Sequence, residues 1–146
     1  MKSAVSRRQF NRGSLIALLT TAAATSVGGL ASAQQPAAAR RDVIKQELPG
    51  EPLRVLSLVE VTYRPGAGFS PHLHANGVVA YVVSGAIASK VGDEPEQMFH
   101  AGDAWWEPPG AIHRVSRNAS LTEPATLLAI YIAPKDATTA DLMKPL

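Results

Sequence analysis

Between residues 49 and 134, apolar and β-branched residues occur in short runs that proline and glycine separate. In the first run, alternate positions from Val55 to Tyr63 can line one face, which is the period of a strand with one buried side. Short runs of this kind, closely spaced and bounded by turn residues, are typical of a β-sandwich or barrel. The predicted strands are Leu53–Tyr63, Val78–Val83, Ala86–Val91, Gln97–His100, Ala104–Glu107, Ile112–Ser116 and Ala125–Ala133. The pattern therefore predicts an all-β domain.

The segments on either side of this domain have a weaker pattern. Residues 34–41 are rich in Ala and Gln and are interpreted as a flexible leader. Asp42–Leu48 is a possible edge strand, so residues 34–48 are expected to form the leader and this strand. Residues 135–146 follow Pro134 and show no period, which predicts a C-terminal tail.

Residues 1–33 have the composition of a bacterial export signal of the twin-arginine type. Its parts are the pair Arg7-Arg8, an apolar run over residues 15–30, and the small-residue pattern Ala31-Ser32-Ala33. A membrane anchor is the alternative, but the run is short and Gly28-Gly29 interrupts it, so it makes a poor membrane-spanning helix. We expect cleavage after Ala33, no stable membrane anchor after cleavage, and a periplasmic or secreted protein.

Removal of this signal changes the charge of the chain. The signal contains Lys2, Arg7, Arg8 and Arg12 and no acidic residue. Taking these four from the 14 Lys and Arg residues leaves 10 against 12 Asp and Glu, a net charge of −2. The basic balance of the whole sequence is therefore no evidence for nucleic-acid binding. The chain has no cysteine, which excludes disulfides, thiol chemistry and thiolate metal ligands.

The candidate chemistry lies in two stretches that contain histidine. His72 and His74 follow Pro71, and in an extended strand the side chains at positions i and i+2 leave on the same face. His113 follows the turn Pro108-Pro109-Gly110, and a neighbouring strand could bring it to the first pair. Three imidazoles suit one divalent transition metal, such as Fe, Mn, Ni, Cu or Zn, better than Mg or Ca. The alternative is that the three are ordinary core or surface histidines.

These two stretches resemble the motifs of the cupin family. Four residues match its first motif at the required spacing, namely Gly66, His72, His74 and Gly85. Four more match its second motif, namely Gly102, Pro108, Gly110 and His113, while Arg117 stands at the last position of that motif and Asn118 follows one residue late. The resemblance extends over about Leu53–Ala133. It implies a double-stranded β-helix, or jelly roll, which is often dimeric and holds a metal inside the barrel.

One position departs from the family pattern. The glutamate of the first motif falls at Val78, and valine cannot bind a metal. The ligand set implied by the resemblance is therefore three histidines, as in family members that oxygenate thiols and diketones. Without the carboxylate the centre is more positive, which favours an anionic, chelating substrate. An obvious general base is also missing, and the substitution is equally compatible with lost activity.

Several other side chains are candidates for the pocket around the histidines. Ala80 and Val82 share the strand face of His74 and Val78, so they are expected to point inward with Val78. Tyr81 then points outward, toward a second sheet or a dimer partner. Of Trp105 and Trp106, one faces the interior by alternation, and Trp106 is taken as the pocket residue.

Two charged residues complete the candidate site. Glu107 is interpreted as a substitute acid, either a hydrogen-bond partner for a histidine ring N–H or a base near the metal, and so as the candidate catalytic residue. The alternative is a solvated carboxylate at a strand end. Arg117 has the same parity as His113 and is a candidate for binding a substrate carboxylate at the pocket mouth, against the alternative of a solvated loop arginine.

Two functions follow from these observations. The first is a metal-dependent oxygenase-like enzyme that acts on a small anionic molecule, aromatic or diketone-like, with Glu107 as the only acid that can be nominated nearby. The second is a non-catalytic periplasmic module that binds a metal or a small molecule, which the valine at position 78 favours. A homodimer is a possible assembly, and no nucleic-acid partner is expected.

Overall fold

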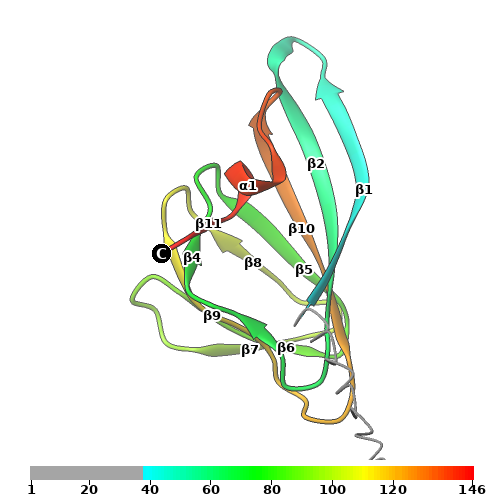
Figure 1. Ribbon diagram of the computed structural model, residues 1–146, viewed down its shortest axis with the longest axis vertical. Coiled ribbons are helices and arrows are strands. Elements are labelled where there is room, and N and C mark those ends of the chain that lie inside the picture. The colour runs from blue at the N-terminus through cyan, green and yellow to red at the C-terminus, as the bar shows by residue number, and fades with distance from the viewer. Residues whose placement is uncertain (1–37) are drawn as a thin grey trace, which may run out of the picture. The chain divides into compact units, whose positions relative to one another are not determined.

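Two antiparallel β-sheets form the fold of residues 38–146, the part of the chain that the computed structural model describes (Figure 1). The expected signal at 1–33 and the first residues of the expected leader lie outside it. The elements in order are β1 (Ala38–Leu48), β2 (Glu51–Tyr63), β3 (Gly68–Phe69), β4 (His72–Leu73), β5 (Val78–Ser84), β6 (Ala86–Val91), β7 (Gln97–His100), β8 (Ala104–Glu107), β9 (Ile112–Asn118), β10 (Ala125–Pro134), α1 (Thr139–Leu142) and β11 (Lys144–Pro145). The all-β class is confirmed.

The strands are shared between a five-stranded and a six-stranded sheet. The first has the order β1-β2-β10-β5-β8, and the second has the order β11-β4-β9-β6-β7 with β3 beside β9. Consecutive strands often lie in different sheets, since β4 and β6 belong to the second and β5 to the first. This connectivity closes two layers around one interior, as a jelly roll does.

Alternation along the long strands fills the interior. In β10 the residues from Ala125 to Ala133 are buried at every second position. Residues opposite one another in the sheet share a face, so Val61 pairs with Leu127, which in turn pairs with Val82. The core therefore lies between the sheets and is made of small and β-branched side chains, with Tyr63 and Tyr131 as its large members.

The first strand begins earlier than the sequence pattern suggests. It starts at Ala38, within the segment expected to be a flexible leader, and pairs with β2 along almost its whole length. Among the described strands it lies at the edge of its sheet, as expected. Most of its side chains are exposed, which explains why residues 38–48 carry little hydrophobic signal.

A β-bulge in β9 changes the side-chain alternation of that strand. Between the pairs Lys90–Val115 and Val91–His113, the strand β9 has one residue more than β6, and this extra residue is Arg114. Ser116 and Asn118 are therefore buried together with His113, although their spacing from it is odd. Positions 113 and 117, which strict alternation would put on one face, lie on opposite faces.

The last residues fold back onto the barrel. The short helix α1 follows Thr138, whose backbone N–H and hydroxyl both donate hydrogen bonds to a carboxylate oxygen of Asp141, at 2.9 and 2.6 Å. Leu142 is buried in the core, and β11 pairs with β4, which contains His72. Figure 1 shows this C-terminal segment, in red, with β11 beside β4. Residues 135–146 are thus an ordered part of the domain and not the expected tail.

None of the helices in residues 38–146 is long and apolar enough to span a membrane.

Candidate metal centre

Three buried histidines meet between the two sheets. His72 lies on β4 directly opposite His113 on β9, and His74 follows β4 by one residue. The three residues are 3–4% exposed, and one ring nitrogen from each lies within 4.8 Å of the others. The i, i+2 spacing and the pairing of two strands therefore bring these imidazoles to one point, and the group could hold a metal ion.

The backbone orients the first two rings. The Nδ1 atom of His72 lies 2.8 Å from the carbonyl oxygen of Ser70, and the Nδ1 atom of His74 lies 2.5 Å from the carbonyl oxygen of Leu142. A carbonyl only accepts a hydrogen bond, so each Nδ1 carries the proton. The Nε2 atom of each ring is then unprotonated, with a lone pair available for a metal ion.

The third ring is held by the protein through its other nitrogen, Nε2. The Nε2 atom of His113 lies 2.9 Å from the Ser89 hydroxyl, and its Nδ1 atom lies 3.0 Å from Oε2 of Glu107. The latter contact is not aligned as a hydrogen bond, and both of its atoms are buried without a hydrogen-bond partner. The ring therefore presents Nδ1 toward the other two histidines.

A buried carboxylate faces the same point. Oε2 of Glu107 is also 3.5 Å from Nε2 of His74, while Oε1 accepts a hydrogen bond of 3.0 Å from the indole N–H of Trp105. The residue is 3% exposed. On the neighbouring strand, the residue directly opposite Glu107 is Val78, the position at which the family motif has its own glutamate. A carboxylate on β8 thus lies opposite the position on β5 where the motif has its own.

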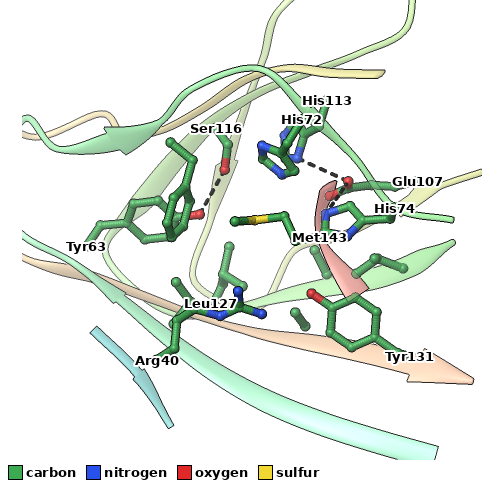
Figure 2. Close-up of a pocket in the computed structure, with 15 residues that line it drawn as sticks. Arg40, Tyr63, His72, His74, Glu107, His113, Ser116, Leu127, Tyr131 and Met143 are labelled. Carbon is green, nitrogen blue, oxygen red and sulfur yellow. Dashed lines mark hydrogen bonds and ion pairs between the residues drawn. The ribbon is translucent and has the colours of Figure 1, made fainter. Parts of the chain in front are cut away.

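The arrangement of donor atoms fits a divalent transition metal ion. One nitrogen from each of the three imidazoles converges, and this is a ligand set that such ions accept. A carboxylate oxygen of Glu107 lies 3.0 and 3.5 Å from two of these rings. The Nδ1 atom of His113 and Oε2 of Glu107 are buried and unsatisfied in the protein alone, which is costly unless a further partner binds them. Figure 2 shows these side chains grouped on one side of the pocket.

The surroundings favour the protonation states that a metal site needs. Burial lowers the pKa of His72 from 6.5 to about 4, and burial also lowers the pKa of His74. For Glu107, burial alone raises the pKa, but the contact with His113, the proximity of His74 and the hydrogen bond from Trp105 outweigh it and lower the pKa. The rings of His72 and His74 are thus neutral and the carboxylate is ionised near pH 7.

The histidines form one wall of a small pocket. Its empty volume is about 370 Å³ when solvent at its open mouth is counted, and the part that a water molecule can occupy is about 30 Å³. The remaining walls are mostly apolar or aromatic, and Arg40 is the single cation that residues 38–146 contribute to them. The lining residues outside the metal centre are Arg40, Val61, Tyr63, Phe69, Val78, Ala80, Ser116, Leu127, Ala129, Tyr131 and Met143.

The inward-facing residues of β5 take two places. Val78 and Ala80 line the pocket beside the histidines. Val82 is fully buried and points inward too, but it belongs to the hydrophobic core further along the barrel. Val82 thus points inward as expected, but it packs in the core and does not line the pocket.

Trp106 does not line this pocket, which corrects the expectation from the sequence. Glu107 points inward, so alternation along β8 turns Trp106 outward, where it is 54% exposed and covers Gly77. The tryptophan associated with the site is Trp105, through its hydrogen bond to Glu107.

Arg117 is also placed away from the pocket. The bulge at Arg114 turns it to the outer face, where its guanidinium forms a 2.5 Å ion pair with Glu96. The expectation that it binds a substrate at the pocket mouth is therefore wrong, because the parity argument does not hold across a bulge.

The sequence reasoning missed three contributions to the site. Arg40 lies in the expected leader, and Leu142 and Met143 lie in the expected tail. Only the pairing of β1 with β2 and of β11 with β4 brings these segments to the barrel. The one local signal was the alternation of Ala38 and Arg40 ahead of the predicted strand, which is too short to be decisive.

Comparison with known proteins identifies the fold and the family. The family model described as a cupin domain matches residues 59–131, which is half of the chain. The protein belongs to the cupin family, and the expected double-stranded β-helix is confirmed. No curated protein matches this chain.

Solved structures agree with this assignment. The crystal structure of TT1209 from Thermus thermophilus is similar with 31% identity and a TM-score of 0.54, over 66% of this chain and 83% of that one. KdgF from Halomonas sp. has 24% identity and a TM-score of 0.56, over 70% of this chain and 84% of that one. The match to the DMSP lyases RdDddP and RnDddQII has 23% identity and a TM-score of 0.53, over 62% of this chain and only 44% of that one. The last two similarities bear on the fold alone.

The lowered pKa of His72 predicts a pH-dependent stability of the metal-free protein. Below pH 6.5 the unfolded chain takes up a proton at this ring, whereas the native protein does so only near pH 4. The free energy of unfolding should therefore fall between pH 7 and pH 4, as measured by urea denaturation. A His72→Gln variant should show a shallower fall, and a slope equal to that of the wild type would contradict the assignment.

Proposed function

We propose that the protein is a metal-dependent, oxygenase-like enzyme acting on a small anionic molecule. His72, His74 and His113 hold one divalent transition metal ion, drawn from Fe, Mn, Ni, Cu and Zn. The observation that carries the proposal is the convergence of three buried histidine nitrogens beside the Glu107 carboxylate, where Nδ1 of His113 and Oε2 of Glu107 lie 3.0 Å apart without a hydrogen bond. When bound, the ion acts as a Lewis acid that binds and polarises substrate or oxygen. The oxygenase-like chemistry rests on the resemblance to three-histidine cupins.

Within this proposal, Glu107 supplies the acidic group of the site. Trp105 fixes Oε1, so Oε2 is held toward His74 and His113. At this position Oε2 can complete the ligand set or take a proton from a bound substrate. We expect the ligand role, because Oε2 has no hydrogen-bond partner and stands across from Val78, where the family motif has its glutamate.

The metal content of purified protein tests the centre itself. We expect one transition metal ion per chain in the wild type, and its loss in His72→Ala, His74→Ala and His113→Ala, because each change removes one donor. His100 is the fourth histidine of the chain and is exposed on β7, so His100→Ala should keep the metal and serves as the matched control. Unchanged metal content in the three variants, measured by elemental analysis, would favour a purely structural cupin.

A carboxylate exchange tests the role of Glu107. The variant Glu107→Val should bind metal about 10–100-fold more weakly, as measured by competition with a chelator. In the double variant Val78→Glu, Glu107→Val, the same two side chains exchange places across one register pair, so volume and charge are conserved. Metal affinity should recover in the double variant. If Glu107→Val binds metal as tightly as the wild type, the residue is an acid or base and not a ligand.

The competing function is a binding module without turnover. Val78 favours it, since the usual carboxylate is absent from the first motif and the pocket has a single nearby acid. Both functions share the metal site, so only turnover separates them. We expect the metal-loaded protein to consume O2 with at least one of a flavonol, a diketone and a thiol substrate, followed with an oxygen electrode. Tight binding of such a compound without O2 uptake, across all five metals, would establish the binding module.

Export and assembly are further parts of the proposal. The Arg7-Arg8 pair, the apolar run and Ala31-Ser32-Ala33 support twin-arginine export to the periplasm or beyond. A homodimer is supported by exposed apolar side chains on the outer face of the five-stranded sheet, which include Val79, Tyr81 and Ile132. The partner of the pocket itself is a small-molecule substrate, and nothing in the charge distribution points to nucleic acid.

A further inference from the structure

Among the described residues, Arg40 is the only cation that lines the pocket, and its strand partner fixes its direction. In the β1–β2 register Arg40 stands opposite Val61, whose buried side chain also lines the pocket. Residues opposite one another share a face, so the side chain of Arg40 is directed into the barrel. The next residue, Arg41, points to the other face and forms a two-pronged contact with Glu60, at 3.1 and 2.9 Å. Two adjacent arginines thus have opposite environments.

The guanidinium of Arg40 lacks a counter-charge within the described part of the chain. Its Nε atom is buried without a hydrogen bond, and none of the described residues 38–146 forms an ion pair with it. Glu107 lies in the same pocket but at the far edge of the same sheet, on β8, and pairs with the histidines instead. A buried donor without a partner is costly, so an acceptor bound at this N–H would stabilise the pocket, and the positive charge of the guanidinium favours an anionic acceptor.

The residues around Arg40 indicate which kind of anion could bind to it. Leu127 and Tyr131 line the same side of the pocket, and Figure 2 shows the Arg40 guanidinium and the Tyr131 hydroxyl directed into it. A guanidinium has a planar array of donors that matches the two oxygens of a carboxylate. The flat, partly apolar wall around it suits a carboxylate attached to a small organic group.

We propose that Arg40 binds the carboxylate of the substrate, so that the pocket takes a small organic carboxylate with its other end at the three histidines. This inference rests on the proposed function, because it names the substrate class of the same site. The proposal also agrees with the net charge of the pocket. A divalent ion, Glu107 and Arg40 together leave two positive charges in the pocket, which an anionic substrate reduces.

Nuclear magnetic resonance of the arginine Nε–H groups tests this role directly. Benzoate is added to the protein freed of metal by a chelator and to the zinc-loaded protein, with benzamide as the neutral isostere. The Arg40 signal, assigned from its absence in Arg40→Lys, should shift with benzoate and not with benzamide. Because the measurement in metal-free protein needs no ion, it separates a failure of this inference from a failure of the metal site.

Variants of the two adjacent arginines provide the control. Arg40→Gln should weaken benzoate binding about tenfold or more, the effect expected when a charged hydrogen-bond partner is lost. Arg41→Gln removes the same charge from the same strand and should leave the affinity unchanged. Arg40→Lys keeps the charge but not the planar array, and should bind with intermediate affinity. It also supplies the test if Arg40→Gln fails to fold.

Three results would overturn the inference. The first is equal benzoate affinity in Arg40→Gln and in the wild type. The second is a wild-type Arg40 signal that does not move with benzoate up to its solubility limit. The third is an equal response of that signal to inorganic phosphate, which would show a general anion site and not a carboxylate site.

Discussion

The burial of one carboxylate and three imidazoles inside a small barrel is the constraint on which the rest of this structure depends. Polar groups in an apolar interior are tolerated only when their donors and acceptors are satisfied. Here each ring has one nitrogen held by the protein, and Trp105 holds one oxygen of Glu107. The remaining nitrogen of each ring and the second oxygen of Glu107 face one another. The protein thus forms hydrogen bonds to the outward-facing polar atoms of the site and leaves the inward-facing ones available to a ligand.

This division explains why distant segments of the chain belong to the site. The carbonyl oxygen of Leu142 orients His74 from 68 residues away, and the pairing of β11 with β4 keeps that carbonyl in place. The adjacent Met143 lines the pocket. Residues 138–146 therefore act as part of the wall of the site, although they form only one turn of helix and a two-residue strand. A closed wall on this side leaves the imidazole in a low-dielectric environment, which accounts for its lowered pKa.

The sequence was sufficient for the features that depend on local periods. The two-residue period of a strand predicts the strands of the barrel. It also predicts that His72 and His74 lie on the same face and that Val78 points inward. The predictions that were wrong or missing concern side chains whose direction depends on the register between strands. Arg117 was misplaced because one inserted residue in β9 reverses the face, and no composition signal marks that bulge. Arg40 was missed because an exposed edge strand has a polar sequence, so its inward positions appear only once its partner strand is known.

The two edges of the five-stranded sheet contribute opposite charges to one interior. β1 at one edge provides Arg40, and β8 at the other edge provides Glu107. Had the two been adjacent, they would have formed a buried ion pair and neutralised each other. Three strands between them prevent this, so the anion remains with the histidines and the cation remains available. A pocket organised in this way binds a ligand by two different ends, one at the metal centre and one at the guanidinium. Because the strand order separates these charges, the two ends of the pocket differ, and a ligand is bound in one orientation.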